Sequence, residues 1–317
     1  MFTIGIDMSK DTFHAALDDR RVLAFANTDD GIEQFMAKIE EEDFPVTDTV
    51  IGVEATGAYH LLFAATLTDH SWRVVILNPL ESHRMITQGL RTVKTDRRDA
   101  QKIRAMTALG KGYAFTDTSD ILALKTLVGE RQALVEMRKT TRQRMDVRLL
   151  KEQAVGSPLH DSFSSILGAI TQEIKAIEQN MDRYEEETQL LLRSIPGVGK
   201  VSAAALAAFV GDIGRFATPE KLVAYIGLDS RVFQSGTSVH GKGFISKRGN
   251  KYLRHILFNA AFIARRRNPA LCAYFEKKLA EGKHYFSAMC AVERKLIHLI
   301  YAVWKRGTPY QAEPPRR

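Results

Sequence analysis

Four acidic residues in the first third of the chain have the types and the spacing of a cation site. Asp7 and Glu54 each close a short apolar run, so each is expected at the end of a strand. Asp96 and Asp99 are three residues apart, which places them on one face of a helix. Magnesium takes several oxygen ligands, and a single carboxylate seldom holds it. Four converging carboxylates could clamp two such ions around a phosphodiester and so support its displacement.

Two other interpretations of these acids stay open. Asp96 could simply favour the positive N-terminus of a helix. Basic neighbours could also neutralise the acids without a metal, and four are close in sequence: Lys94, Arg97, Arg98 and Lys102.

The opening IGIDMSKDT is similar to the first phosphate loop of actin-like ATPases and sugar kinases. That fold needs a second Asp at a strand end. The nearest candidate, Asp212, follows a predicted helix, which disfavours the ATPase and kinase interpretation.

The last third of the chain offers a hydroxyl nucleophile inside a basic segment. The 46 residues between Asp229 and Glu276 contain no acid and nine bases. Charge this one-sided is expected where several phosphates are neutralised. A serine hydroxyl attacks only when a base, a metal or nearby cations favour its alkoxide. The Gly/Ser/Thr-rich part of this segment holds Ser235, Ser238 and Ser246, and spacing alone does not distinguish them from one another or from ordinary turn serines.

A second nucleic-acid contact is predicted at IPGVGKVSAAAL, which has the pattern of a tight turn between two helices. Backbone amides at such a turn, together with a helix N-terminus, can cradle a phosphate. The stretch is similar to the helix-hairpin-helix module of DNA-binding proteins, although a simple helical corner has the same pattern. The predicted nucleic-acid-binding residues of the turn and of the basic segment are Gly197, Gly199, Lys200, Lys242, Lys247, Arg248, Lys251 and Arg254.

The order of elements in the first part is expected to bring the four acids together. Apolar runs bounded by turn residues predict strands at 2–6, 13–17, 21–26, 49–54 and 72–77. Helical patterns occupy 31–42, 59–69 and 94–109. Three hairpin-type strands followed by alternating helix and strand is the order of a ribonuclease-H-like fold.

Long helices are predicted in the middle of the chain. From Ile121 to about Arg193 the pattern is helical, with a break at Gly156-Ser157-Pro158, which predicts an antiparallel hairpin. Its second arm has a coiled-coil seam with a lapse at Thr188: Leu167, Ile170, Ile174, Ile177, Met181, Tyr184 and Leu191. Its first arm is basic, and these residues could form a solvated face or contact nucleic acid: Arg131, Arg138, Lys139, Arg142, Arg144, Arg148 and Lys151.

Length and charge agree with a division into unlike parts. A chain of 317 residues exceeds the usual size of one core. Residues 1–118 carry 18 acids and 13 bases, a net charge of −5, whereas the remainder carries 19 acids and 32 bases, a net charge of +13. A basic part joined to an acidic part suggests polyanion binding beside a region that holds cations.

Composition also excludes several classes of protein. No run of 18 apolar residues occurs, and the opening MFTIGIDMSK has no signal-peptide pattern, so a cytoplasmic protein without membrane contact is expected. Cys272 and Cys290 lack paired spacing and are expected to be reduced thiols, not a disulfide or a zinc site.

Taken together, these residues resemble the DEDD transposases of bacterial insertion sequences, a family that includes the pilin gene invertases and the bridge-RNA-guided serine recombinases. The similarity covers nearly the whole chain. Its N-terminal part rests on GIDMSK, VEATGAY, ILNP and GLRTVKTDRRDA, and its C-terminal part on SIPGVG, FATPEKLVAYIGLDSR and QSGTSVHGKGFISKRGNKYLR. Several motifs in a fixed order are far more specific than any one of them.

The resemblance implies a fold of the α/β plus all-α class with three domains. Residues 1–118 would form a RuvC-like, ribonuclease-H-like DEDD catalytic domain. Residues 119–193 would form a helical coiled-coil connector, and residues 194–317 a helical C-terminal transposase domain with the helix-hairpin-helix-like motif and the catalytic serine.

The resemblance also implies the site and its partners. Ser235 of the QSG motif matches the catalytic serine, and the metal ligands for Mg²⁺ are Asp7, Glu54, Asp96 and Asp99. The carboxylates and the serine would come from different protomers of a homo-oligomer, a dimer or a tetramer. A structured guide RNA would pair with donor and target DNA, so that base pairing reads the sequence and the protein reads the backbone.

These residues are compatible with three functions. In the predicted one, a recombinase, Ser235 attacks a phosphate to form a covalent protein–DNA intermediate, which a new partner strand then resolves. The alternatives are a junction-resolving nuclease that uses water, and a nucleic-acid-binding protein without chemistry whose acids only balance neighbouring bases. A trapped covalent adduct would separate the first from the other two.

Overall fold

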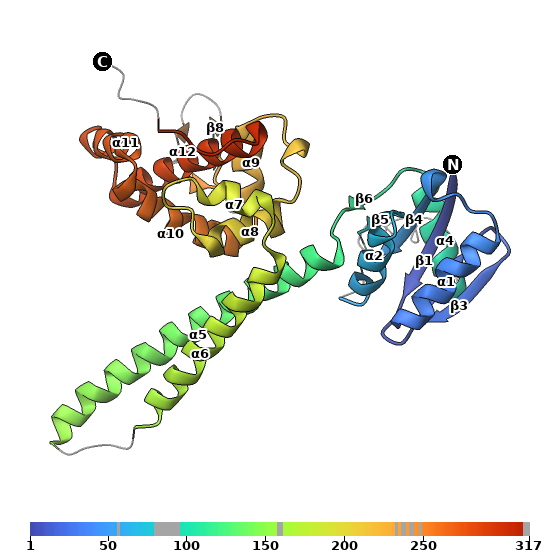
Figure 1. The fold of residues 1–317 in the computed structure, drawn as a ribbon, viewed down its shortest axis with the longest axis horizontal. Coiled ribbons are helices and arrows are strands. Elements are labelled where there is room, and N and C mark those ends of the chain that lie inside the picture. The colour runs from blue at the N-terminus through green and yellow to red at the C-terminus, as the bar shows by residue number, and fades with distance from the viewer. Residues whose placement is uncertain are drawn as a thin grey trace. The chain divides into compact units, whose positions relative to one another are not determined.

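The protein is described by a computed structural model that covers residues 1–55, 58–78, 96–156, 161–231, 234–235, 239–240, 244–246 and 249–312. The chain divides into two compact units, Met1–Leu122 and Ala123–Arg317 (Figure 1). The first is an α/β unit, and the second consists mainly of helices.

A mixed sheet forms the centre of the N-terminal unit. Within the described residues its strands lie in the order β3-β2-β1-β4-β5-β6. Their bounds are β1 (Phe2–Met8), β2 (Thr12–Ala16), β3 (Val22–Ala26), β4 (Thr49–Glu54), β5 (Arg73–Leu77) and β6 (Tyr113–Phe115). The first three are antiparallel neighbours, β4 runs parallel to β1 and to β5, and β6 is antiparallel at the edge. The five predicted strands are confirmed, whereas β6 was not predicted because three residues are too short for an alternation.

Helices cover the two faces of this sheet. Apolar residues of β1 pack with α1 (Asp29–Glu41) and α2 (His60–Asp69) in one core, which includes Phe13, Phe35 and Phe63 in mutual ring contact. The other face is covered by α4 (Asp96–Ala108), which contacts β1, β2 and β4. All three predicted helices of this unit are confirmed, with shifts of a few residues at their ends.

The second unit begins with a helical hairpin. Its arms are α5 (Ser119–Val155) and α6 (Phe163–Asn180), as the sequence predicts (Figure 1). Ile170, Ile174 and Ile177 are buried along the seam. The prediction that the coiled-coil seam continues to Leu191 is wrong, because α6 ends at Asn180.

The break in the seam has a local cause. A 3-10 turn, η2 (Met181–Tyr184), follows α6, and Glu185 and Glu186 then adopt extended backbone conformations. Met181 and Tyr184 keep the apolar spacing through this turn, although the backbone is no longer α-helical. A new helix, α7 (Glu187–Arg193), buries Leu192 in the core of the C-terminal helices.

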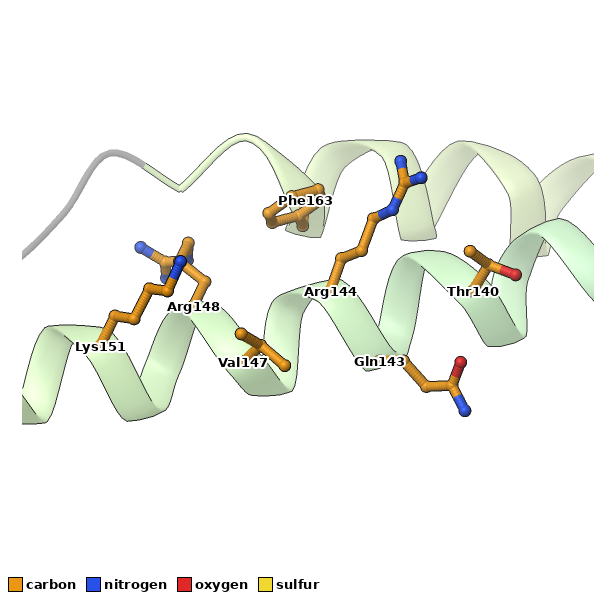
Figure 2. Close-up of a pocket in the computed structure, with 7 residues that line it drawn as sticks. All are labelled: Thr140, Gln143, Arg144, Val147, Arg148, Lys151 and Phe163. Atoms are coloured by element: carbon orange, nitrogen blue, oxygen red, sulfur yellow. The ribbon is translucent and has the colours of Figure 1, made fainter.

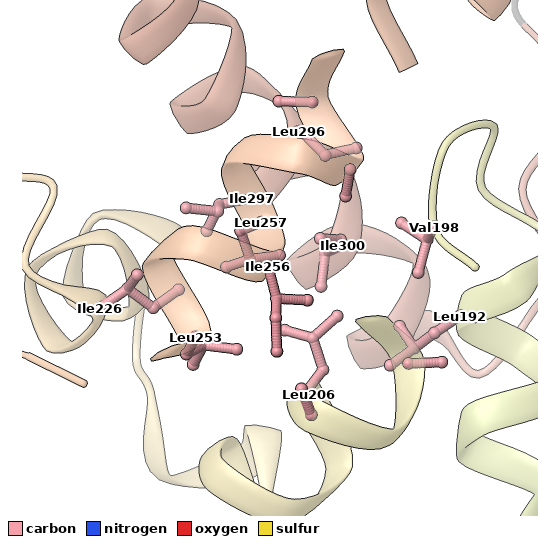
Figure 3. Packing of buried hydrophobic residues seen from close by; sticks show 14 of the residues in the cluster. Leu192, Val198, Leu206, Ile226, Leu253, Ile256, Leu257, Leu296, Ile297 and Ile300 are labelled. Atoms are coloured by element: carbon pink, nitrogen blue, oxygen red, sulfur yellow. The ribbon is translucent and has the colours of Figure 1, made fainter. Parts of the chain in front are cut away.

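The C-terminal helices pack around α12 (Tyr285–Arg306). The others are α8 (Lys200–Val210), α9 (Pro219–Ile226), α10 (Lys251–Arg267) and α11 (Pro269–Ala280). Figure 3 shows Leu253 and Leu257 of α10 packing with Ile297 and Ile300 of α12. Leu124 at the base of the hairpin belongs to the same core. The predicted boundary between residues 193 and 194 therefore falls inside one unit, and a separate connector domain stays a prediction.

Four short strands, which were not predicted, interrupt the helices. They form two antiparallel pairs, β7 (Ser230–Arg231) with β10 (Phe244–Ile245), and β8 (Gln234–Ser235) with β9 (Val239–His240). Cys272 and Cys290 are free, as expected. None of the described helices has the length and apolarity needed to cross a bilayer.

Candidate active site

Two glycines in adjacent strands bring α4 into close contact with the sheet. Gly5 and Gly52 are register partners in β1 and β4. A Cβ atom at Gly5 would lie 2.2 Å from the amide nitrogen of Arg104 and 2.3 Å from the carbonyl oxygen of Ala100. A Cβ atom at Gly52 would lie 1.8 Å from Oγ1 of Thr107. Only glycine therefore permits α4 to lie this close to the two strands.

The same two strands present carboxylates on the face that α4 covers. Side chains alternate along a strand, so Asp7 lies on the same face as Gly5, and Glu54 on the same face as Gly52. The parallel register makes Asp7 and Glu54 neighbours, one residue beyond the last recorded β1–β4 pair. Both side chains are half-buried.

The first turn of α4 adds the other two acids at this end of the sheet. Because Ala100 lies against Gly5, the preceding turn reaches the end of β1, where Asp7 lies. That turn carries Asp96, which is exposed, and Asp99, which is half-buried.

Electrostatics agree with this convergence. The pKa of Asp7 is raised from its ordinary value of 3.8 to about 6, first by burial and then by repulsion from Asp99, Asp96 and Glu54, while His14 opposes the rise. The other three acids that the sequence singled out thus lie near enough to Asp7 to repel its charge.

Two basic side chains accompany the acids. His14 of β2 is the antiparallel register partner of Asp7, a position that sequence reasoning missed because it requires the register of the hairpin. Lys102 donates to Oδ1 of Asp99 over 2.7 Å and offsets one of the four negative charges. Lys94, the other predicted neutralising lysine, lies outside the described residues.

The chemistry of these side chains suits a hard divalent cation. Four carboxylates supply only oxygen ligands, and burial together with repulsion from the other three acids raises the pKa of Asp7. Within the described ranges, no three acidic, histidine or cysteine side chains are gathered tightly enough to enclose a metal ion. Residues 56–57 and 79–95, which separate Glu54 from Asp96 in the chain, lie outside the described residues.

The close approach of α4 gives a direct test of how these acids are positioned. Gly5→Ala should destabilise the protein by about 1–3 kcal/mol, because the added methyl group meets backbone atoms of α4 and the helix must move away. Thermal unfolding measures this loss. Gly129→Ala is the control: Gly129 lies in α5, where a Cβ would meet nothing within 4 Å, and the change should stabilise by about 0.5–1 kcal/mol. Equal effects of the two changes would contradict the role of Gly5.

The segment with the candidate nucleophile is closed at its base. The backbone of Ser235 pairs with Val239. Ser246 is 7% exposed, its amide donates to the carbonyl of Asp229 over 2.9 Å, and its hydroxyl is hydrogen-bonded to Oδ1 of Asp229. Both of these hydrogen bonds go to Asp229 and join the two ends of the segment. This structural role disfavours Ser246 as the nucleophile. The side chain of Ser235 and all of Ser238 lie outside the described residues.

Two arginines hold the chain on either side of this segment. Arg254 donates to the carbonyl of Ile226 over 3.0 Å and to that of Gly249 over 2.6 Å. Nε of Arg294 donates to the carbonyl of Leu228 over 2.7 Å. These bonds account for the placement of Arg254, and its predicted contact with nucleic acid stays a prediction.

The charges of the two arginines act on a buried acid that sequence reasoning missed. Glu293 of α12 is 2% exposed, and its Oε1 has no hydrogen-bond partner within the described residues. Burial raises its pKa from 4.5 to about 8, although Arg254 and Arg294 act in the opposite direction. An acid within an otherwise apolar helical face was the signal available in the sequence.

Glu293 should make stability depend on pH. Because its pKa is higher in the folded than in the unfolded protein, its contribution is fully present below pH 4.5 and is lost as the pH rises through about 8. Glu293→Gln should remove this loss, which is on the order of a few kcal/mol. Thermal melts of both proteins at pH 5 and pH 9 test it. The exposed Glu173→Gln serves as control, and an equal decline in all three proteins would contradict the assignment.

The residues of the predicted phosphate-binding turn differ in their surroundings: one is packed against a helix, one is exposed and one is in an ion pair. Gly197 has a φ of +96°, and a Cβ there would lie 2.5 Å from the amide nitrogen of Ala264, so this glycine is required for packing against α10. Gly199 is exposed and caps α8 without a side-chain hydrogen bond, while Lys200 forms an ion pair with Asp182.

The predicted contacts of the basic segment are only partly described. Lys251 is exposed at the start of α10, with its Nζ 4.8 Å from the ring centroid of Tyr252. Lys242, Lys247 and Arg248 lie outside the described residues.

Comparison with known proteins matches both parts of the chain. Residues 4–152 match a transposase family profile, the DEDD transposases of the IS110 type, and residues 189–276 match the transposase IS116/IS110/IS902 family. The chain is 30% identical over 318 residues to the pilin gene-inverting protein of Moraxella lacunata, with 97% of each chain covered. It is 24% identical to the transposase for insertion sequence element IS1328 of Yersinia enterocolitica, over 97% of this chain and 98% of that protein.

Proposed function

Because this chain belongs to the IS110 family of DEDD transposases, we propose that it is a recombinase that cuts and rejoins DNA through Ser235. The observation that supports the proposal is that Glu54 of β4 and Asp96 and Asp99 of α4 lie near enough to Asp7 of β1 to repel its charge. Carboxylates from two strand ends and one helix are the arrangement that metal-dependent phosphodiester chemistry needs.

The proposed fold of the first unit is RuvC-like. Three antiparallel strands are followed by strands parallel to the first, and the order β3-β2-β1-β4-β5 supports a ribonuclease-H-like core. Asp7 and Glu54 lie at the carboxyl ends of β1 and β4, the position where open α/β sheets commonly hold ligands.

The four acids are the proposed ligands of Mg²⁺. When bound, the ion polarises the scissile phosphate and lowers the negative charge that a nucleophile must approach. The protein contributes the placement of the ligands: Gly5 allows α4 to approach, and Lys102 orients the Asp99 carboxylate through its 2.7 Å contact.

Ser235 is the proposed nucleophile. Its oxygen forms a bond to phosphorus while the bond from phosphorus to the leaving deoxyribose oxygen breaks, and the serine proton passes to that oxygen. The hydroxyl end of a partner strand then reverses the exchange and restores the serine. Each step replaces one phosphoester bond with another of similar energy, so the exchange needs no external energy source such as a nucleoside triphosphate.

The proposed partners follow from the same family membership. Donor and target DNA are the substrates, a structured guide RNA selects them, and a dimer or tetramer brings the carboxylates of one protomer to the serine of another. The proposed compartment is the cytoplasm. Supporting the DNA contact are the exposed Lys251 and the uncapped N-terminus of α8 at Gly199.

The test of this function is capture of a protein-linked DNA strand. The protein is incubated with a plasmid that carries its own insertion sequence, with and without a magnesium chelator, and the products are separated on a denaturing gel. The proposal expects a DNA strand that protease treatment releases, and only in the presence of magnesium. Free cleaved strands without an adduct would instead support the nuclease that uses water.

A further inference from the structure

The helical hairpin carries a basic groove near its tip (Figure 2). The groove has a volume of about 490 Å³. It is lined by Thr140, Gln143, Arg144, Val147, Arg148 and Lys151 of α5 and by Phe163 of α6. Three cations and no acid therefore line it.

The basic residues of this groove form one stripe along α5. Arg144, Arg148 and Lys151 are related by steps of four and three residues, so they lie on the same helix face and span about 10 Å of its axis. DNA carries one phosphate per about 3.4 Å along each strand, so the stripe matches about three phosphates.

Arg148 has a structural role within the stripe. It is 13% exposed and lies 3.3 Å from Oε2 of Glu152 and 3.9 Å from Oδ1 of Asp161. Asp161 in turn accepts hydrogen bonds from the amides of Phe163 and Ser164 at the start of α6. Arg148 therefore ties the two arms together and fixes the shape of the groove.

Arg144 and Lys151 on either side of it are available to a ligand. Both are exposed, and neither has an ion pair within the part of the chain that the structure describes. The other end of the hairpin differs, since Arg131 there donates to Glu178 over 2.7 Å. Arg131 at the base is thus paired, whereas Arg144 and Lys151 near the tip have no ion pair among the described residues.

We propose that this groove binds the sugar-phosphate backbone of duplex DNA, with Arg144 and Lys151 on the phosphates. Thr140 and Gln143 at the far end of the groove can donate hydrogen bonds to further phosphate oxygens. Such contacts carry no sequence information and hold the duplex in register. The inference deepens the proposed function, because it places part of the DNA contact outside the basic C-terminal segment.

The experiment measures binding of the full-length protein to a labelled DNA duplex of about 30 base pairs, roughly three helical turns, over a series of salt concentrations. The test variant is Arg144→Gln/Lys151→Gln. The matched control is Arg142→Gln/Lys139→Gln, which removes the same charges from exposed positions of α5 that do not line the groove. All four positions are exposed, so both variants should melt like the wild type.

Loss of two phosphate contacts should lower the slope of log K against log salt by about 1.8 and weaken binding by up to about 60-fold at 0.1 M salt. The control should lose much less. Equal losses of affinity in the two variants, or no loss in either, would overturn the proposal that the groove binds DNA. The proposal would also be overturned if the test variant kept its DNA affinity but changed its self-association, measured by light scattering. That result would identify the tip as a contact between two copies of the chain. If the wild type itself does not bind DNA, the proposed function fails together with the groove.

Discussion

Ser235→Ala should lose DNA cleavage and strand exchange altogether while it still binds DNA. If the serine oxygen is the nucleophile, the change removes the attacking atom, and Ser246 is not placed to replace it, because it is buried and engaged with Asp229. A nuclease that uses water should lose little from the same change, since bound metal lowers the pKa of water. The measurement is the protein-linked strand on a denaturing gel, with binding followed in parallel.

Two further variants sharpen this comparison. Ser235→Cys could retain a trace of covalent capture, although a thiolate suits hard magnesium poorly. Ser246→Ala is the matched control, because it removes a hydroxyl from the same segment and should reduce stability by about 1 kcal/mol without removing the adduct. Robust hydrolysis by Ser235→Ala, or an adduct that maps to Ser238 or Ser246, would overturn the assignment of the nucleophile.

The N-terminal unit was predictable because its signals are local. Each long strand is an apolar run bounded by turn residues, and carboxylates that close two such runs must meet if the strands are parallel neighbours. Asp7 and Glu54 follow this rule. His14 does not, because its place beside Asp7 depends on the register of β1 and β2, which the sequence specifies only through a turn.

The C-terminal unit was less predictable because its decisive contacts involve backbone atoms. Arg254 belongs by composition to a basic segment that suggests nucleic-acid binding, yet its guanidinium donates to two carbonyls. No pattern of side chains in the sequence predicts a hydrogen bond to a backbone carbonyl. The spacing of Met181 and Tyr184 likewise suggested a continuing helix, because apolar periodicity is similar in α-helical and 3-10 turns.

Asp7→Asn should abolish DNA cleavage with folding intact, since an amide of similar size keeps the shape but removes a charge that retains magnesium. Without metal the variant should be at least as stable as the wild type. The reason is that the Asp7 carboxylate is half-buried and repelled by Asp99, Asp96 and Glu54, which together raise its pKa to about 6. If Asp7 served only to stabilise the fold, Asp7→Asn would instead be less stable than the wild type.

Thermal melts with and without magnesium separate these two possibilities. Saturating magnesium should raise the wild-type melting temperature by about 5 °C at a hundred times its dissociation constant. The rise should shrink at pH 5, where Asp7 is protonated and must release its proton before it can hold a cation. Asp11→Asn, an exposed acid in the turn between β1 and β2, should behave like the wild type. If the rise persists undiminished in Asp7→Asn, the ion binds elsewhere, and the four acids on the α4 face of the sheet are not its ligands.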